Sequence, residues 1–101
     1  FVGGSGASEY WDNPTAHKIA NDASNAKKLV GAICIAPVTL AKAGLLKNKK
    51  ATTFSSTIND IKTAGAKYTG ADVERDGNII TASGPAAAQK FGETIVKALS
   101  Q

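Results

Sequence analysis

The sequence predicts an α/β fold in which helices cover both faces of a mostly parallel sheet. Segments typical of strands alternate with segments typical of helices, and this order is that of parallel strands with helical connections. The apolar residues are mostly Ala, Ile, Val and Leu, and aromatic residues make up only 6% of the chain. That composition suits small α/β layers better than a β-sandwich. At 101 residues the chain holds one domain at most.

The helices are predicted from the residues that begin and end them. Asn13 and Pro14 give a start signal, with Asn13 as the N-cap and Pro14 in the first turn. Gly44 and Gly65 each follow a predicted last turn. The predicted helices cover residues 14–25, 37–44, 58–64 and 86–99. Apolar residues at helical spacing mark the faces that we expect to be buried, which are Ala16, Ile19, Ala20 and Ala23 in the first helix and Ala88, Phe91, Gly92, Ile95, Ala98 and Leu99 in the last.

Short apolar or β-branched runs between the helices predict the strands, at residues 29–33, 51–54, 67–68, 72–74 and 79–82. Asp76-Gly77 supplies a tight turn between the last two, so one hairpin joins the sheet at an edge. Phe1 and Val2 have the character of the last residues of a further strand, and two residues are too few to hold a place in a sheet alone. We therefore expect residues 1–101 to be a partial domain, with the N-terminal strands missing here or supplied by another chain.

Charge and hydropathy argue against two classes of partner. The chain carries 12 basic and 8 acidic residues, but its lysines are scattered, apart from Lys47, Lys49 and Lys50. A nucleic-acid interface needs a concentrated basic face, so nucleic acid is not an expected partner. Neither is a membrane, because no apolar run approaches the roughly 18–20 residues that span a bilayer. A single cysteine cannot form an internal disulfide, and no signal segment opens the sequence, which together favour the cytoplasm.

Cys34, the only cysteine, lies where a predicted strand turns into a predicted helix. Backbone N–H groups and the positive end of a helix dipole favour the thiolate, which is the nucleophilic form. A free cysteine in an apolar run often packs as a small hydrophobic side chain. Here, however, Ala32 and Ala36 leave room around the sulfur, and an elbow between strand and helix lifts it out of the core. The pattern therefore favours a functional thiol over a structural one.

The glycine cluster at residues 3–6 allows two interpretations. It is either a plain flexible loop or a backbone whose N–H groups face an anion or a developing oxyanion, since glycine permits close approach. Because it follows a strand end at Phe1-Val2, we expect it at the same edge of the sheet as Cys34. Its spacing differs from that of dinucleotide and phosphate fingerprints, and no cofactor is predicted.

Few titratable side chains are available to assist the thiol. His17, the only histidine, falls inside the first predicted helix and is expected on its surface, although a Cys34–His17 dyad stays open. Glu9, Asp12 and Glu74 could each orient a base, but solvated charges are the favoured interpretation. One histidine and one cysteine are too few for a zinc site, so no metal is predicted.

Several segments of the chain, taken in order, resemble the DJ-1/PfpI superfamily, whose members are relatives of class I glutamine amidotransferases. The match spans essentially the whole chain, and its pieces are specific only in combination. The segments are residues 2–7, 31–37, 43–47, 65–68, 75–81 and 83–85, which read VGGSGA, GAICIAP, AGLLK, GAKY, RDGNIIT and SGP.

The resemblance implies a flavodoxin-like three-layer sandwich that lacks its N-terminal strands in this chain, with Cys34 at a nucleophile elbow. It implies that backbone N–H groups of Gly3, Gly4 and Ile35 serve as oxyanion donors. It also implies that an activating glutamate lies upstream of Phe1 and that the complete domain forms dimers or higher oligomers.

Two departures from the family pattern bear on activity. Protease-like members carry a histidine directly after the nucleophile, where this chain has Ile35, so a peptidase is disfavoured. Phe54 stands nearest to the place of a histidine that other members have in the strand after the elbow helix. No general base therefore remains visible in the chain itself.

Two functional hypotheses follow from the resemblance. In the first, the protein is a hydrolase or lyase acting on small reactive carbonyls, as glyoxalase- and deglycase-like members do, with Cys34 adding to an aldehyde carbon. In the second, it is a non-catalytic stress or chaperone-like protein whose Cys34 is oxidised to sulfenic or sulfinic acid.

Overall fold

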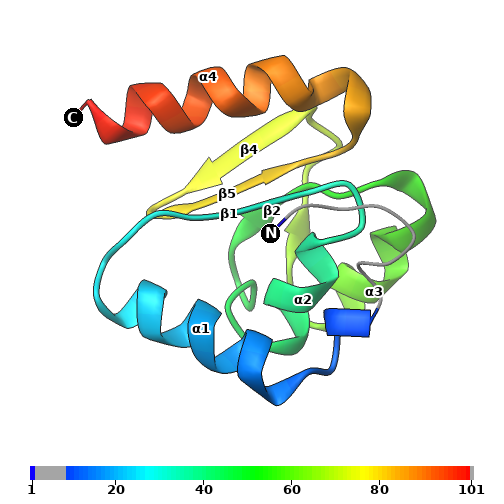
Figure 1. Cartoon of the computed structure of the whole chain (residues 1–101). Helices are drawn as coiled ribbons and strands as arrows, with labels where there is room; N and C mark the ends of the chain where they lie inside the picture. The colour runs from blue at the N-terminus through cyan, green and yellow to red at the C-terminus, as the bar shows by residue number, and fades with distance from the viewer. Residues whose placement is uncertain (2–8, 101) are drawn as a thin grey trace.

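The computed structural model describes Phe1 and residues 9–100. In it a central sheet separates helix α4 on one face from helices α1, α2 and α3 on the other (Figure 1). The predicted α/β fold with helices on both faces is thus confirmed. The helices are α1 (Pro14–Asn25), α2 (Pro37–Lys42), α3 (Ile58–Thr63) and α4 (Ala88–Leu99), and the strands are β1 (Val30–Ile33), β2 (Lys50–Ala51), β3 (Lys67–Tyr68), β4 (Val73–Asp76) and β5 (Ile79–Ala82).

The main sheet has the strand order β1-β5-β4. Strand β1 runs parallel to β5, with Val30 opposite Ile79, while β4 and β5 form the predicted antiparallel hairpin. Gly77 alone in its turn has a positive φ, of 62°, which suits the first position of a type II′ turn. On the outer side of β1, the amino group of Phe1 donates to Gly31 O and Phe1 O accepts from Ile33 N. These two bonds flank one residue of β1, which is the pattern of a parallel pair.

The second, two-stranded sheet shows where the predicted strand at residues 51–54 was too long. Only Lys50–Ala51 pairs as a strand, with β3 in parallel. The next residue leaves the ladder because the Thr52 N–H donates to the Thr81 hydroxyl of β5, at 2.9 Å. The Lys50 N–H likewise donates to the Asp76 carboxylate, at 2.9 Å. Side chains of the β4–β5 hairpin therefore accept hydrogen bonds from main-chain N–H groups at positions 50 and 52. From apolar periodicity alone, these N–H groups would be expected to pair with a neighbouring strand.

The core fills the space between the sheet and the three helices α1, α2 and α3. Its largest fully buried apolar side chains are Leu40, Leu46, Ile61 and Val38. A smaller cluster of Ile33, Ala82 and Ala87 lies at the α4 side. None of the helices among the described residues is long and apolar enough to cross a membrane.

Helix α4 is amphipathic, but the sheet covers its apolar stripe only in part. Phe91 and Ile95 are half-buried, as predicted, whereas Gly92 is exposed and Leu99 is 70% exposed. No residue of the helix is fully buried. The reason is the narrow sheet beneath it, whose strands β1, β4 and β5 each have only 4 residues.

Helix α1 begins as predicted. The Asn13 side chain accepts hydrogen bonds from the N–H groups of Thr15 and Ala16, at 2.9 and 3.0 Å. Ala16 and Ala20 are buried. The expected burial of Ile19 is wrong, because its side chain is 59% exposed.

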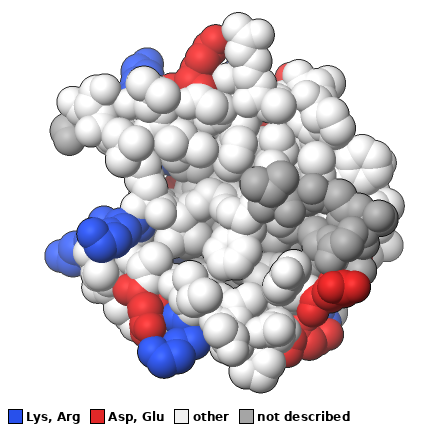
Figure 2. Space-filling model, viewed as in Figure 1, with Lys and Arg blue, Asp and Glu red and all other residues white. Residues whose placement is uncertain are grey.

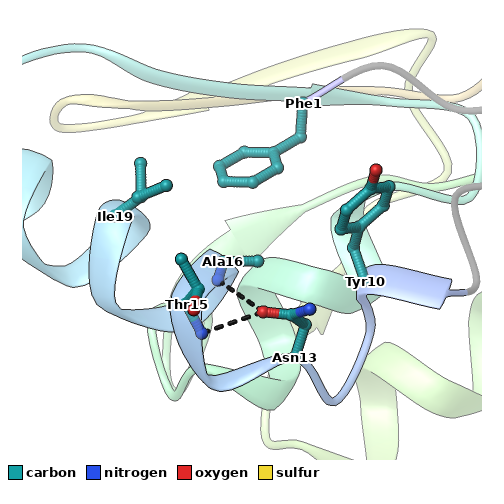
Figure 3. A pocket seen from close by; sticks show the side chains of 6 residues that line it. All are labelled: Phe1, Tyr10, Asn13, Thr15, Ala16 and Ile19. Carbon is teal, nitrogen blue, oxygen red and sulfur yellow. Dashed lines mark hydrogen bonds between the residues drawn. The ribbon is translucent and has the colours of Figure 1, made fainter.

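Ile19 instead lines an open groove between α1 and Phe1. The groove has a volume of about 500 Å³ and is lined by Phe1, Tyr10, Asn13, Thr15, Ala16 and Ile19. In the view of Figure 2 the charged side chains lie toward the rim of the molecule, and the central surface is uncharged. Figure 3 shows Phe1 and Ile19 facing each other across this groove, with Tyr10 at its other end.

Candidate active site

Cys34 occupies the elbow between β1, which ends at Ile33, and α2, which begins at Pro37. Its φ is 62°, a left-handed conformation that costs a residue with a Cβ roughly 1–2 kcal/mol. Three hydrogen bonds hold the main chain in this position. The Cys34 N–H donates to Ala82 O at 3.1 Å, while the Cys34 carbonyl accepts from Phe54 N at 2.9 Å and from the Thr53 hydroxyl at 3.0 Å.

The Cys34 side chain is half-buried and free of any disulfide. On one side it packs against the cluster of Ile33, Ala82 and Ala87. Within the described part of the chain, no hydrogen bond reaches its sulfur. The thiol thus lies between the core and the surface, as an elbow position predicts, while direct amide bonding of the sulfur stays a prediction.

Ile35 follows the cysteine and is fixed through its carbonyl oxygen. That oxygen accepts from the indole N–H of Trp11 at 3.1 Å and from Val38 N at 3.3 Å. The N–H of Ile35, by contrast, has no acceptor among the described residues. A free N–H next to the sulfur is what an oxyanion donor requires, so the predicted role of Ile35 stays compatible with the structure. The other expected donors, Gly3 and Gly4, lie outside the described residues.

Phe54, which stands nearest to the place of the family histidine, is bonded to the cysteine through its main chain. Its N–H bonds the Cys34 carbonyl, and its ring is 41% exposed. Gly84 lies directly beneath the ring: a Cβ there would come within 3.2 Å of Phe54 Cδ1. Position 54 therefore carries an apolar ring, which cannot exchange protons.

His17 does not form the conceivable dyad with Cys34. Its Nε2 lies 2.6 Å from the carbonyl oxygen of Trp11, and this acceptor requires Nε2 to carry the proton. The ring is half-buried on the helix. Through Trp11 the histidine supports the turn that bonds Ile35.

The acidic candidates do not gather at the site. Glu9 and Asp12 are exposed in the turn before α1, and Glu74 is half-buried in β4. Within the described residues, no group of three or more His, Cys, Asp or Glu side chains could hold a metal ion.

Trp11 and Thr53 are the two contributors that the sequence interpretation missed. Both act on main-chain oxygens of the elbow, and both come from segments distant in sequence. A lone tryptophan in a small α/β chain was the one available signal. Nothing in the sequence distinguishes Thr53 from its neighbour Thr52.

Comparison with known proteins places this elbow in a family. The model of the DJ-1/PfpI family matches residues 1–98. A protein of Methanocaldococcus jannaschii is 44% identical over 104 residues, which cover 100% of this chain and 51% of that protein. A deglycase of Thermococcus kodakarensis is 36% identical over 72 residues, covering 71% of this chain and 43% of the relative.

Solved structures agree with the sequence comparison. The ThiJ/PfpI domain protein of Brachyspira murdochii superposes with a TM-score of 0.95 at 28% identity, covering 98% of this chain and 58% of that one. The chain therefore spans about half the length of the curated relatives it matches. Together with the elbow at Cys34 and the order of the strands, these matches show that the chain belongs to the DJ-1/PfpI family.

Proposed function

We propose that this chain carries the nucleophile of a cysteine-dependent hydrolase or lyase that acts on small reactive carbonyls. The observation that carries the proposal is the left-handed backbone of Cys34, held by three hydrogen bonds. Strained conformations of this kind cluster at active sites, where the surrounding structure fixes them. Two relatives named as deglycases, from Thermococcus kodakarensis and Pyrococcus horikoshii, support the choice of substrate class.

The proposed chemistry begins with the thiolate of Cys34. Its sulfur forms a bond to the aldehyde carbon, the carbonyl π pair moves to the oxygen, and a hemithioacetal oxyanion results. The free N–H of Ile35 and the N–H groups of Gly3 and Gly4 stabilise this oxyanion. A glutamate upstream of Phe1 takes the thiol proton and later returns it to the oxyanion.

Turnover of methylglyoxal by the purified full-length protein tests this proposal. We expect Cys34→Ala to reduce the rate to that of the uncatalysed reaction, since the nucleophile is lost. Ser56→Ala, an exposed change in the turn before α3, is the control and keeps the wild-type rate. Equal rates for wild type and Cys34→Ala would end the proposal.

The apolar side chain of Phe54 favours a second candidate function, in which Cys34 senses oxidants without turnover. Among the described residues, the only side chain in hydrogen-bond contact with Cys34 is that of Thr53, whose hydroxyl does not serve as a general base. The thiolate would attack a peroxide oxygen, the O–O bond would break, and sulfenic acid would form with release of hydroxide. Intact-mass spectra after mild peroxide then show one or two added oxygens on Cys34. A thiol that resists both peroxide and iodoacetamide at neutral pH contradicts both functions.

We propose further that the remaining half of the domain packs over the groove at Phe1, Tyr10 and Ile19. The length of the relatives supports this proposal, because this chain covers only 51% and 43% of two of them. The occupant is a strand and helix segment with an apolar face, and the completed domain forms a homodimer. Native mass measurement tests this expectation, and a stable, isolated 10.3 kDa species contradicts it.

A further inference from the structure

Two buried threonines next to the elbow form a chain of hydroxyl groups that ends on the Cys34 carbonyl. Thr53 and Thr57 are only 1% and 3% exposed. Their hydroxyl oxygens lie 2.7 Å apart. The Thr53 hydroxyl is also 3.0 Å from Cys34 O, and the Thr57 hydroxyl is 3.0 Å from Phe54 O. The chain therefore makes three short contacts between two hydroxyls and two carbonyls.

These three contacts cannot all be hydrogen bonds at once. Each hydroxyl carries a single proton, so the two threonines supply two protons for three contacts. The 2.7 Å contact between the hydroxyls is the shortest and needs a proton between the oxygens. If Thr57 donates to Thr53, then Thr53 donates to Cys34 O. If Thr53 donates to Thr57, then Thr57 donates to Phe54 O, and Cys34 O loses its hydroxyl donor.

Both arrangements are accessible, because neither leaves a carbonyl oxygen without a hydrogen-bond donor. Phe54 O keeps the N–H of Thr57, at 2.9 Å, when the hydroxyl of Thr57 turns away. Cys34 O keeps the N–H of Phe54, also at 2.9 Å, when Thr53 turns away. Because each carbonyl always retains one donor, the cost of reversing the chain is small.

The direction of the chain matters because of what lies on the other side of the Cys34 carbonyl. Cys34 C=O and Ile35 N–H belong to one peptide group, and this N–H has no acceptor among the described residues. A hydrogen bond donated to a peptide oxygen polarises the group and strengthens its N–H as a donor. The hydroxyl of Thr53 can thus act on the N–H beside the sulfur without touching the sulfur itself.

We infer that Thr53 is a positioning residue that polarises the Cys34–Ile35 peptide group, and that Thr57 competes for its proton. The inference rests on the proposed role of Cys34 as a reactive thiol for its functional meaning. It assigns opposite effects to two neighbouring buried threonines. Thr53 increases the strength of the N–H of Ile35, and Thr57 decreases it by drawing the Thr53 proton away.

Three substitutions separate this role from a merely structural one. Thr53→Val keeps the side-chain shape and removes the donor to Cys34 O. Thr57→Val removes the competing acceptor, so Thr53 donates to Cys34 O continuously. Thr53→Ser restores the hydroxyl and is expected to behave as wild type. Both valine variants remove one buried hydroxyl and leave the other with a carbonyl acceptor, so their losses of stability are matched.

The first readout is the amide proton resonance of Ile35 in NMR spectra of the purified protein. We expect this resonance to move upfield in Thr53→Val and downfield in Thr57→Val, because the N–H becomes a weaker and a stronger donor respectively. Thr53→Ser keeps the wild-type position. A shift in the same direction for both valine variants, or no shift, would overturn the inference.

The second readout is the rate of Cys34 alkylation by iodoacetamide across pH. We expect Thr53→Val to react about twofold more slowly than wild type across this pH range, since the N–H beside the sulfur becomes a weaker donor and coupling along hydrogen-bond chains is roughly 10–30% per bond. Thr57→Val reacts faster, and Thr53→Ser matches wild type. If the Ile35 resonances move as expected while wild-type Cys34 reacts no faster than glutathione, the inference stands and the proposed function fails. If Cys34 reacts faster than glutathione while the Ile35 resonance does not move in either valine variant, the proposed function stands and the inference fails.

Discussion

At the scale of single residues, Cys34 is one of three described residues with a side chain and a positive φ, together with Lys27 and Asn48. A left-handed conformation is easy for glycine, but this position carries a side chain. The family resemblance drew attention to Phe54, as the nearest equivalent of a histidine in other members. The bonds from Trp11 and Thr53 were not predictable, since they join a side chain to a main-chain oxygen far away in sequence.

The strain at Cys34 gives a stability prediction that is independent of chemistry. Cys34→Gly and Cys34→Ala both remove the sulfur and differ only in the Cβ that opposes a φ of 62°. We expect the glycine variant to have the higher free energy of unfolding by about 0.5–1 kcal/mol, after allowing for its greater entropy when unfolded. Urea denaturation measures this difference. Asn48, exposed and also at φ 62°, should show the same order for its glycine and alanine variants; the reverse order at Cys34 alone would show that no strain is stored there.

At the scale of elements, the helices depend on residues that the sequence already marks. Asn13 caps α1 through two main-chain donors, and Gly44 follows α2 with a φ of 84°. The positions of the helices were predictable because capping and terminating residues act on the main chain next to them in sequence. Burial along the helices was harder to predict. Ile19 and Leu99 are exposed because neither the sheet nor Phe1 covers them, and the sequence does not show how far that cover extends.

The cap of α1 gives a direct test at this scale. Asn13→Ala removes the acceptor for Thr15 N and Ala16 N. We expect a loss of about 1 kcal/mol in the free energy of unfolding, which is typical of a lost N-cap. Asn13→Asp keeps an acceptor and places a negative charge at the helix start, so it should retain wild-type stability. Similar losses in both variants would show that the cap bonds contribute little.

Two glycines with open space around them, Gly44 and Gly92, give a second test, of how backbone conformation affects helix stability. A Cβ at Gly44 or at Gly92 would meet nothing within 4 Å, and the two sites differ in backbone conformation. Gly92→Ala should stabilise α4 by about 0.5–1 kcal/mol, because alanine is the better helix former. Gly44→Ala should destabilise the protein by a similar amount, since φ is positive there. Thermal unfolding distinguishes the two signs, and a stabilising Gly44→Ala is the contrary result.

At the scale of the whole molecule, the order of helical and sheet layers was predictable, and the strand length in the two-stranded sheet was not. Alternation of strands and helices was enough to predict a sheet between two helical layers. The strand predicted at residues 51–54 was too long, because Thr52 bonds a hydroxyl of β5 instead of a strand partner. Apolar periodicity reports burial, and it carries no information about which group receives a main-chain donor.

The open groove yields a prediction for the complete protein. Ile19 and Val96 are similarly exposed in this chain, at 59% and 65%, but only Ile19 lines the groove. If the rest of the domain covers the groove, Ile19→Ser should destabilise the complete protein by about 1–2 kcal/mol more than Val96→Ser, as expected for a buried aliphatic side chain. Chemical denaturation of both variants gives the difference. Equal losses would place the remaining half elsewhere.

The position of β5 between β1 and β4 has a consequence for how the molecule matures. The β4–β5 hairpin is local in sequence and closes quickly, whereas β1 waits for a partner far downstream, and non-local pairing of this kind is slow. The amide of Cys34 is tied to Ala82, the last residue of β5. The main-chain bonds of the elbow are therefore complete only when β5 has paired with β1, because the acceptor for the Cys34 amide is the last residue of β5.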